Sequence, residues 1–141
     1  MNGLDQLLRL QKWTLDEKRR QAVDLTALIE RLESDIAKLD DEVAREIEIA
    51  RGDLEASRHL PPYREMMAKR RERLEQSVAD VTLELERIRD EIAEAFNDIK
   101  KTEQTIQNRQ ERRRQAIARR EQIATDEMAI EQHRRKAKRE N

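Results

Sequence analysis

The sequence predicts an all-α protein: a long antiparallel two-helix coiled-coil hairpin with a C-terminal helical overhang. Charged residues make up 43% of the 141 residues, and hydrophobic residues only 36%. Ala, Glu, Lys, Leu and Arg dominate, as they do in long helices and coiled coils. Leucine and isoleucine recur with heptad spacing in both halves of the chain. A narrow two-helix seam buries less apolar surface than a globular core, so this composition is sufficient for it.

Two heptad seams support this prediction. Ten of the twelve a and d positions from Leu4 to Val43 are apolar, and so are ten of twelve from Met67 to Ile106. Seams longer than three heptads indicate a coiled coil, whereas two helices of a larger bundle would show a wider apolar stripe. The residues expected to line the seam are Leu25, Ile29, Leu32, Ile36, Leu39, Leu74, Val78, Val81, Leu85, Ile88, Ile92 and Ile99.

A double proline lies between the two seams. Pro61 and Pro62 lack amide donors, and each disfavours helix in the residue before it. Asn2 is the expected N-cap of the first helix, and Gly52 either ends that helix early or is tolerated inside it. We expect one coiled-coil domain over residues 1–141, with a first helix over about 3–57, a turn over about 58–62 and a second helix over about 63–136.

The pairing of the two seams has two alternatives. In the preferred register, paired residue numbers add up to about 113 or 114, so that Leu39 faces Leu74. Shifting the pairing by one heptad makes Val43 face Val78, but it also sets Gln11 and Leu8 against Arg109 and Arg113. The preferred register gives arms of roughly 50 residues, or about 75 Å at 1.5 Å per residue.

Residue types that carry catalysis or bind cofactors are sparse. The chain has no cysteine, and His59 and His133 lie far apart in the sequence, at no metal-ligand spacing. No apolar run approaches the length that spans a bilayer. We therefore expect a cytoplasmic protein without enzymatic activity, cofactor or direct membrane insertion.

Charge is unevenly distributed along the chain. Residues 30–55 carry ten acidic and four basic side chains, whereas residues 109–141 carry eleven basic and six acidic ones. The basic region includes the cluster Arg112, Arg113 and Arg114. It is either a solvated tail or a docking end for an acidic partner. A nucleic acid is not expected, because the net charge is −1 and no aromatic residue interleaves with the arginines.

Two groups of apolar residues are candidates for contacts with a partner. Leu10 and Trp13 occupy heptad positions c and f, which face away from the seam, and they are neighbours on a helix surface. Exposed Leu and Trp side by side suggest a binding contact, or else packing against the C-terminal overhang. Leu60 and Tyr63 lie at the expected tip, where they either cap the hairpin core or contact a second partner.

Three segments of the chain have distinctive sequences. The first is Leu7–Gln21, which reads LLRLQKWTLDEKRRQ, and the others are Glu94–Lys101 and Arg119–Gln122. All three resemble the FliJ family of flagellar type III export proteins, particularly its alphaproteobacterial members. The similarity in length and the basic C-terminus extend the resemblance over nearly the whole chain.

The resemblance implies a stalk of the export apparatus. Members of this family form an antiparallel two-helix coil, similar to that of the rotary ATP synthase gamma subunit. They bind the hexameric flagellar export ATPase, contact the membrane export gate and escort export chaperones. A protein of this kind would lie in the cytoplasm, peripheral to the inner membrane. By the comparison with the gamma subunit, Leu4–Leu15 and Arg109–Arg120 would dock in the ATPase ring.

Other interpretations stay open at this point. The stalk of a virulence-type type III secretion ATPase would have nearly the same sequence features, and a generic coiled-coil adaptor would share the heptads. A transcript-cleavage factor would need acidic residues at the tip, where this chain has His59–Tyr63. A prefoldin-like holdase would need strands, for which no alternating apolar pattern exists.

Overall fold

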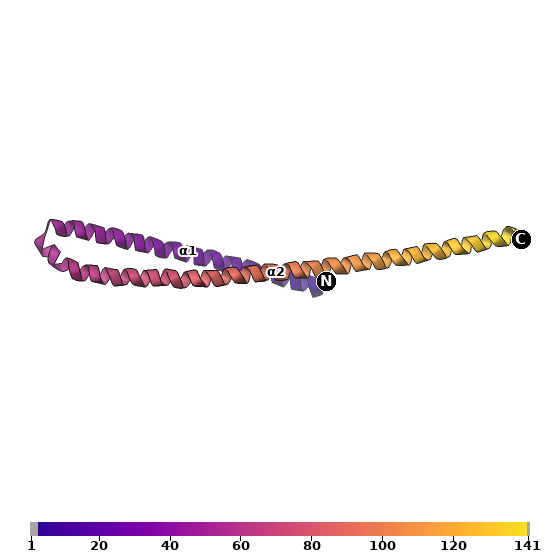
Figure 1. The fold of residues 1–141 in the computed structure, drawn as a ribbon, viewed down its shortest axis with the longest axis horizontal. Helices are drawn as coiled ribbons and strands as arrows, with labels where there is room; N and C mark the ends of the chain where they lie inside the picture. The colour runs from indigo at the N-terminus through magenta and orange to yellow at the C-terminus, as the bar shows by residue number, and fades with distance from the viewer. Residues whose placement is uncertain (1–2, 141) are drawn as a thin grey trace. The chain divides into compact units, whose positions relative to one another are not determined.

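The computed structural model describes residues 3–140, which form two long α-helices. Helix α1 extends over Gly3–Arg51 and helix α2 over Leu54–Glu140. The two helices run antiparallel and pack against each other, and α2 is the longer one (Figure 1). The fold is therefore the all-α antiparallel hairpin expected from the sequence. The expected N-cap, Asn2, lies outside the described residues.

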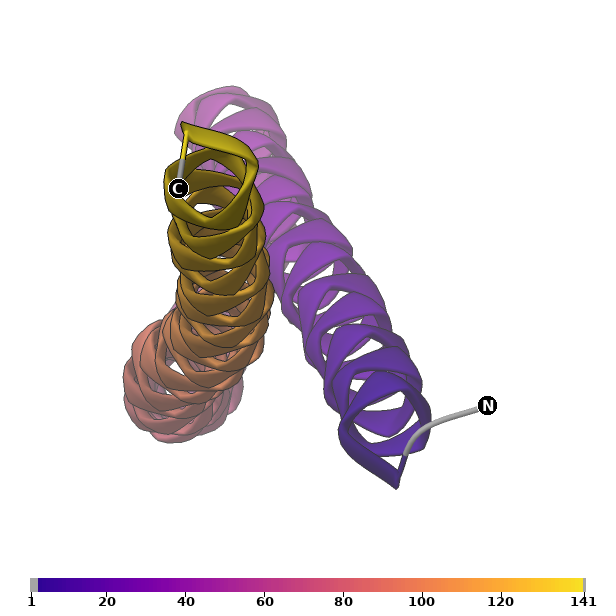
Figure 2. The same ribbon diagram turned by 90° about the vertical axis from the view of Figure 1, so that its right-hand side faces the viewer.

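The helices divide into two units. The first unit, Gln11–Phe96, contains most of α1, the turn and the first half of α2. The second unit combines the described residues up to Leu10 with α2 from Asn97 onward. Figure 2, turned by 90° from the first view, shows α1 and α2 as separate coils. Each unit is described separately below.

A thin apolar seam forms the core of the unit Gln11–Phe96. Leu39, Met67, Leu85 and Ile88 are buried there, and Ile88 is only 2% exposed. In the other unit, Ile99 is buried. All twelve residues expected to line the seam are buried or half-buried: Leu39, Leu85, Ile88 and Ile99 are buried, and Leu25, Ile29, Leu32, Ile36, Leu74, Val78, Val81 and Ile92 are half-buried.

Contacts within Gln11–Phe96 determine the register of the two helices. Leu39 and Leu74 line the same hollow, as the preferred register requires. Val43 shares a hollow with Met67, and the Asp40 carboxylate accepts a hydrogen bond of 2.9 Å from Arg71 Nε. The alternative register, which pairs Val43 with Val78, is therefore not the one adopted.

The predicted position of the turn, residues 58–62, is wrong. The chain leaves α1 after Arg51 and starts α2 at Leu54, so the turn consists of Gly52 and Asp53. The Asp53 Oδ1 atom accepts hydrogen bonds from the amides of Glu55 and Ala56, at 3.0 and 3.4 Å. These bonds make Asp53 the N-cap of α2, and capping satisfies amides that a helix start leaves unpaired.

The end of α1 also favours a turn at this position. The Gly52 amide donates to the carbonyl of Ile49 at 3.2 Å, which tightens the last turn of the helix. Glycine weakens a helix interior, because it loses more backbone entropy than other residues on folding. Gly52 does not need a positive φ to make this turn. Low helix propensity followed directly by a capping residue therefore separates the two helices.

Both prolines lie inside α2 rather than between the helices. Pro61 and Pro62 follow the Asp53 cap by two turns, and both are exposed. The fixed φ of proline is close to the helical value, but proline lacks the amide donor to the carbonyl four residues earlier, and its ring crowds that carbonyl. In α2 these carbonyls belong to Ser57 and Arg58. The helix accommodates these losses and continues to Glu140.

Candidate interaction surface

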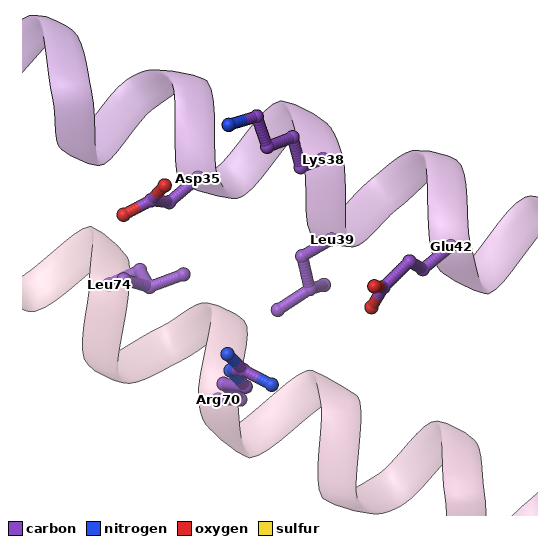
Figure 3. A pocket seen from close by; sticks show the side chains of 6 residues that line it. All are labelled: Asp35, Lys38, Leu39, Glu42, Arg70 and Leu74. Atoms are coloured by element: carbon purple, nitrogen blue, oxygen red, sulfur yellow. The ribbon is translucent and has the colours of Figure 1, made fainter.

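The hollows of the hairpin are open grooves between two helices. One is lined by Leu39 and Leu74 at its base, with charged side chains of both signs around them (Figure 3). In the figure, Leu74 points toward Leu39 across the groove. The remaining lining residues are Asp35, Lys38, Glu42 and Arg70. The groove therefore offers apolar contact flanked by charges of both signs.

A metal site does not emerge from the described part of the chain. Within residues 3–140, no three His, Cys, Asp or Glu side chains come together in a way that could hold a metal ion. His59 and His133 are both exposed on α2. In the same residues, neither helix has an apolar stretch suited to crossing a bilayer.

Ion pairs connect the two helices on the flanks of the seam in Gln11–Phe96. The Lys18 ammonium lies 2.8 Å from a carboxylate oxygen of Glu91. The Arg71 guanidinium donates two hydrogen bonds to the Asp40 carboxylate, at 2.9 and 3.3 Å, and a further one to Glu75. The hydrogen bond from Arg71 is the main reason why the pKa of Asp40 is lowered. Lys18 lowers the pKa of Glu91 in the same way.

These pKa changes predict that the hairpin loses stability in acid. A carboxylate whose folded pKa lies below its unfolded value stabilises the folded state above the unfolded pKa, which is about 4, and loses that effect as the pH falls through the folded pKa. The urea midpoint should therefore fall with pH in this range. The double variant Asp40→Asn/Glu91→Gln should show a weaker pH dependence, measured by circular dichroism during urea unfolding.

A matched variant controls for the change in net charge. Asp24→Asn/Glu86→Gln removes two exposed carboxylates that form no ion pair among the described residues. Its pH dependence should follow that of the unmodified chain. Identical pH dependence in both double variants would show that the two ion pairs between the helices do not contribute.

The N-terminal candidates, Leu10 and Trp13, are exposed. The exposed fraction is 59% for Leu10 and 61% for Trp13. Both belong to α1, three residues apart, and therefore lie on neighbouring positions of its surface. Their positions c and f predicted this exposure, since such positions face away from the seam. Trp13 in particular presents a large apolar side chain to solvent, where a partner could cover it.

The arginine cluster lies in the unit that contains α2 from Asn97 onward. Arg112, Arg113 and Arg114 are exposed, and Arg114 pairs with Glu111 of its own helix at 3.6 Å. Arg113 lines a hollow together with Asp5, Ile106, Arg109 and Gln110. The structure thus places Arg113 beside the first turns of α1, and Leu10 does not line this hollow.

The tip candidates are less exposed than the N-terminal ones. Leu60 and Tyr63 are both half-buried. Burial raises the pKa of the Tyr63 hydroxyl, and the nearby carboxylates of Glu46 and Glu42 raise it further. Tyr63 therefore lies against α1 in the hairpin, in keeping with a residue that caps the core.

More exposed apolar residues lie near the turn, and of these Leu54 and Ile49 were not predicted from the sequence. Leu54 is 75% exposed, while Ile49 and Met66 are 56% and 57% exposed. The signal that would have found Leu54 is Asp53 directly before it, because a capping residue predicts a helix start at the next position.

Comparisons with known proteins do not assign the chain to a family. A scan of protein-family models, a search of curated proteins and a search of solved structures each found no match. The two-helix hairpin is therefore established by the chain's own structure. Any more specific identity depends on the sequence segments described above.

Proposed function

We propose that this chain is a non-enzymatic stalk of the bacterial flagellar type III export apparatus. In this proposal it binds the hexameric export ATPase and links it to the membrane export gate and to export chaperones. It would act in the cytoplasm, at the inner face of the membrane. Support comes from the three resembling segments and from the hairpin fold, which that family shares.

The exposure of Trp13 carries this proposal. Trp13 lies within Leu7–Gln21, the longest of the resembling segments, and its side chain is 61% exposed. Binding energy at interfaces concentrates in buried aromatic anchors, especially tryptophan. An exposed tryptophan in the segment most similar to an ATPase-binding family is the natural anchor for that ATPase. The exposed Arg112–Arg114 cluster would add charge that guides encounter.

Binding of the purified flagellar ATPase hexamer to the immobilised full chain tests the proposal. Surface plasmon resonance should show Trp13→Ala weakening the complex by about 2 kcal/mol, or roughly thirtyfold, mainly through faster dissociation. Reversing the charges of Arg112, Arg113 and Arg114 should mainly slow association, with a larger effect at low ionic strength.

Two control variants separate these effects from general damage. Val23→Ala shortens an exposed apolar residue of the same helix, which is 67% exposed, and should bind normally. Charge reversal at Arg31, Arg45 and Arg73, which are also exposed, matches the change in net charge. Normal binding by both the Trp13 and the Arg112–Arg114 variants would contradict the proposal. A preference for a virulence-type secretion ATPase would assign the chain to that system instead.

A further inference from the structure

The C-terminal part of α2 is exposed along its whole length. Every residue from 107 to 140 is exposed, including Ile117, Ile123, Met128 and Ile130, whose exposed fractions range from 54% to 64%. This stretch belongs to the unit that starts at Asn97. A helix with this many exposed large apolar side chains has a surface available to a partner.

The heptad seam of α2 continues into this exposed stretch. Counting onward from Ile106, the d positions are Arg109, Ala116, Ile123, Ile130 and Ala137, which are spaced by seven residues. They therefore lie in one line along the helix. The a positions between them carry charge, and they are Arg113, Arg120, Glu127 and Arg134. The face is thus half of a coiled-coil seam, with arginine at three of its four a positions.

The hairpin itself shows how this sequence accommodates a basic residue in a seam. Lys18 and Arg71 occupy seam positions in Gln11–Phe96, and each pairs with a carboxylate of the facing helix, Glu91 and Asp40. Glu91 directly precedes the seam residue Ile92, and Asp40 directly follows the seam residue Leu39. A basic seam residue is therefore matched by an acid placed next to the partner's seam.

The arginines of the exposed face pair with no carboxylate of a facing helix among the described residues. Among residues 3–140, Arg113, Arg120 and Arg134 form neither an ion pair nor a hydrogen bond. The ion pairs of this stretch, Arg114 with Glu111 and Arg135 with Glu131, use neighbouring arginines and stay within the helix. Residues 109–140 also carry eleven basic and six acidic side chains. The face therefore has apolar contacts and positive charge without a partner for either.

We infer that residues 113–137 bind an acidic amphipathic helix of another protein. The occupant would have an apolar heptad seam that packs against Ile123 and Ile130. It would carry carboxylates beside that seam, opposite Arg113, Arg120 and Arg134, as Asp40 and Glu91 do in the hairpin. The inference rests on Ile123, Ile130 and the arginines between them, and not on Trp13, the proposed ATPase anchor. Arg113 also belongs to the cluster proposed to guide ATPase binding, so the variants below leave it unchanged.

Other occupants fit the face less well. A second copy of the same stretch would bring two strongly basic helices together, and like charges along a coiled coil disfavour pairing. A nucleic acid would pair with the arginines but leave Ile123 and Ile130 exposed. Single-strand binding also uses aromatic stacking, and the three aromatic residues of the chain, Trp13, Tyr63 and Phe96, all precede this stretch.

Fluorescence anisotropy with the full chain and a designed helical peptide tests this inference. The probe is a four-heptad peptide with leucine at a and d and glutamate at e and g, and a second peptide carries lysine in place of glutamate. The chain should bind the acidic peptide and not the basic one. Ile123→Gln/Ile130→Gln should weaken binding about tenfold or more, because it removes the apolar contact while keeping a good helix former.

Charge variants test the second part of the inference. Arg120→Glu/Arg134→Glu should weaken binding of the acidic peptide about tenfold or more and shift preference toward the basic one. Lys136→Glu/Arg139→Glu makes the same change in net charge at positions c and f, away from the seam, and should have an effect of about twofold or less. Circular dichroism would show that all variants stay helical.

Several outcomes would overturn the inference. Acidic-peptide binding that survives Ile123→Gln/Ile130→Gln, or falls equally with Lys136→Glu/Arg139→Glu, would reflect unspecific charge attraction. Tighter binding to a DNA duplex or to phosphatidylglycerol vesicles than to the peptide would identify a different class of partner. A dimer in light scattering that these isoleucine substitutions dissociate would make a second copy the occupant. The effect of Trp13→Ala on ATPase binding tests the proposed function and leaves this inference unchanged.

Discussion

Substitution of Ile88 by aspartate should destabilise the hairpin by on the order of 3 kcal/mol or more. Ile88 is 2% exposed, the lowest value reported among the buried seam residues. An aspartate there would bury a charge without a partner and also remove the apolar contacts of the isoleucine. The measurement is urea unfolding followed by far-UV circular dichroism, with the free energy taken from the midpoint and slope.

Leu83→Asp is the matched control for this substitution. Leu83 lies one turn and a half before Ile88 on the same helix, but it is 65% exposed. The same change of residue type at an exposed position should alter the free energy of unfolding by about 0.5 kcal/mol or less. Equal effects of Ile88→Asp and Leu83→Asp would mean that Ile88 is not buried in a seam, and the hairpin packing would then be incorrect.

Cysteines introduced together at positions 39 and 74 should cross-link within one chain in high yield. Leu39 and Leu74 line the same groove and face each other across it (Figure 3). The natural chain has no cysteine, so no other thiol competes. A short bifunctional thiol reagent should therefore produce mainly the intramolecular product, which mass spectrometry of a proteolytic digest identifies.

Cysteines at positions 43 and 78 provide the comparison. Val43 shares its groove with Met67, so Val78 lies more than one heptad farther along the helix, a shift of at least about 10 Å at 1.5 Å per residue. This pair should give little intramolecular product with the same reagent. High yield from Val43→Cys/Val78→Cys and low yield from the first pair would establish the alternative register. Products linking only separate chains would contradict the hairpin.

The hairpin fold could be predicted because its signal is periodic and long. Each a and d position of a two-helix seam favours an apolar residue, so many residues, Leu39 and Leu85 among them, indicate the same buried face. The same periodicity predicted that Leu10 and Trp13 face away from the seam. It also favoured the register that places Leu39 against Leu74, since the alternative sets Leu8 and Gln11 against arginines.

The turn could not be predicted in the same way, because it depends on a local competition. Pro61 and Pro62 disfavour helix by known amounts, but Gly52 and Asp53 offer a helix end followed by a helix cap. The Asp53 side chain accepts hydrogen bonds from two amides of α2, and both prolines lie exposed inside that helix.

The candidate surface residues also fall into two groups, those predictable from the heptad pattern and those that depend on the position of the turn. Heptad position alone predicted the exposure of Trp13, whereas the half-buried state of Leu60 and Tyr63 follows from the position of the turn. Moving the turn to Gly52–Asp53 places these two residues inside α2, where Tyr63 lies near the α1 carboxylates Glu42 and Glu46. The most exposed apolar residue near the turn is Leu54, which no periodic pattern distinguishes.

The sequence by itself determined that two helices pair through an apolar seam, because heptad spacing is a property of each helix alone. Tertiary structure decided which charges meet. Arg71 pairs with Glu75 of its own helix, and Lys18 has no acidic residue three or four positions away. Only the packed register brings Asp40 beside Arg71 and Glu91 beside Lys18. An ion pair between two helices depends on their relative position to within a few ångströms, and no single helix specifies that position.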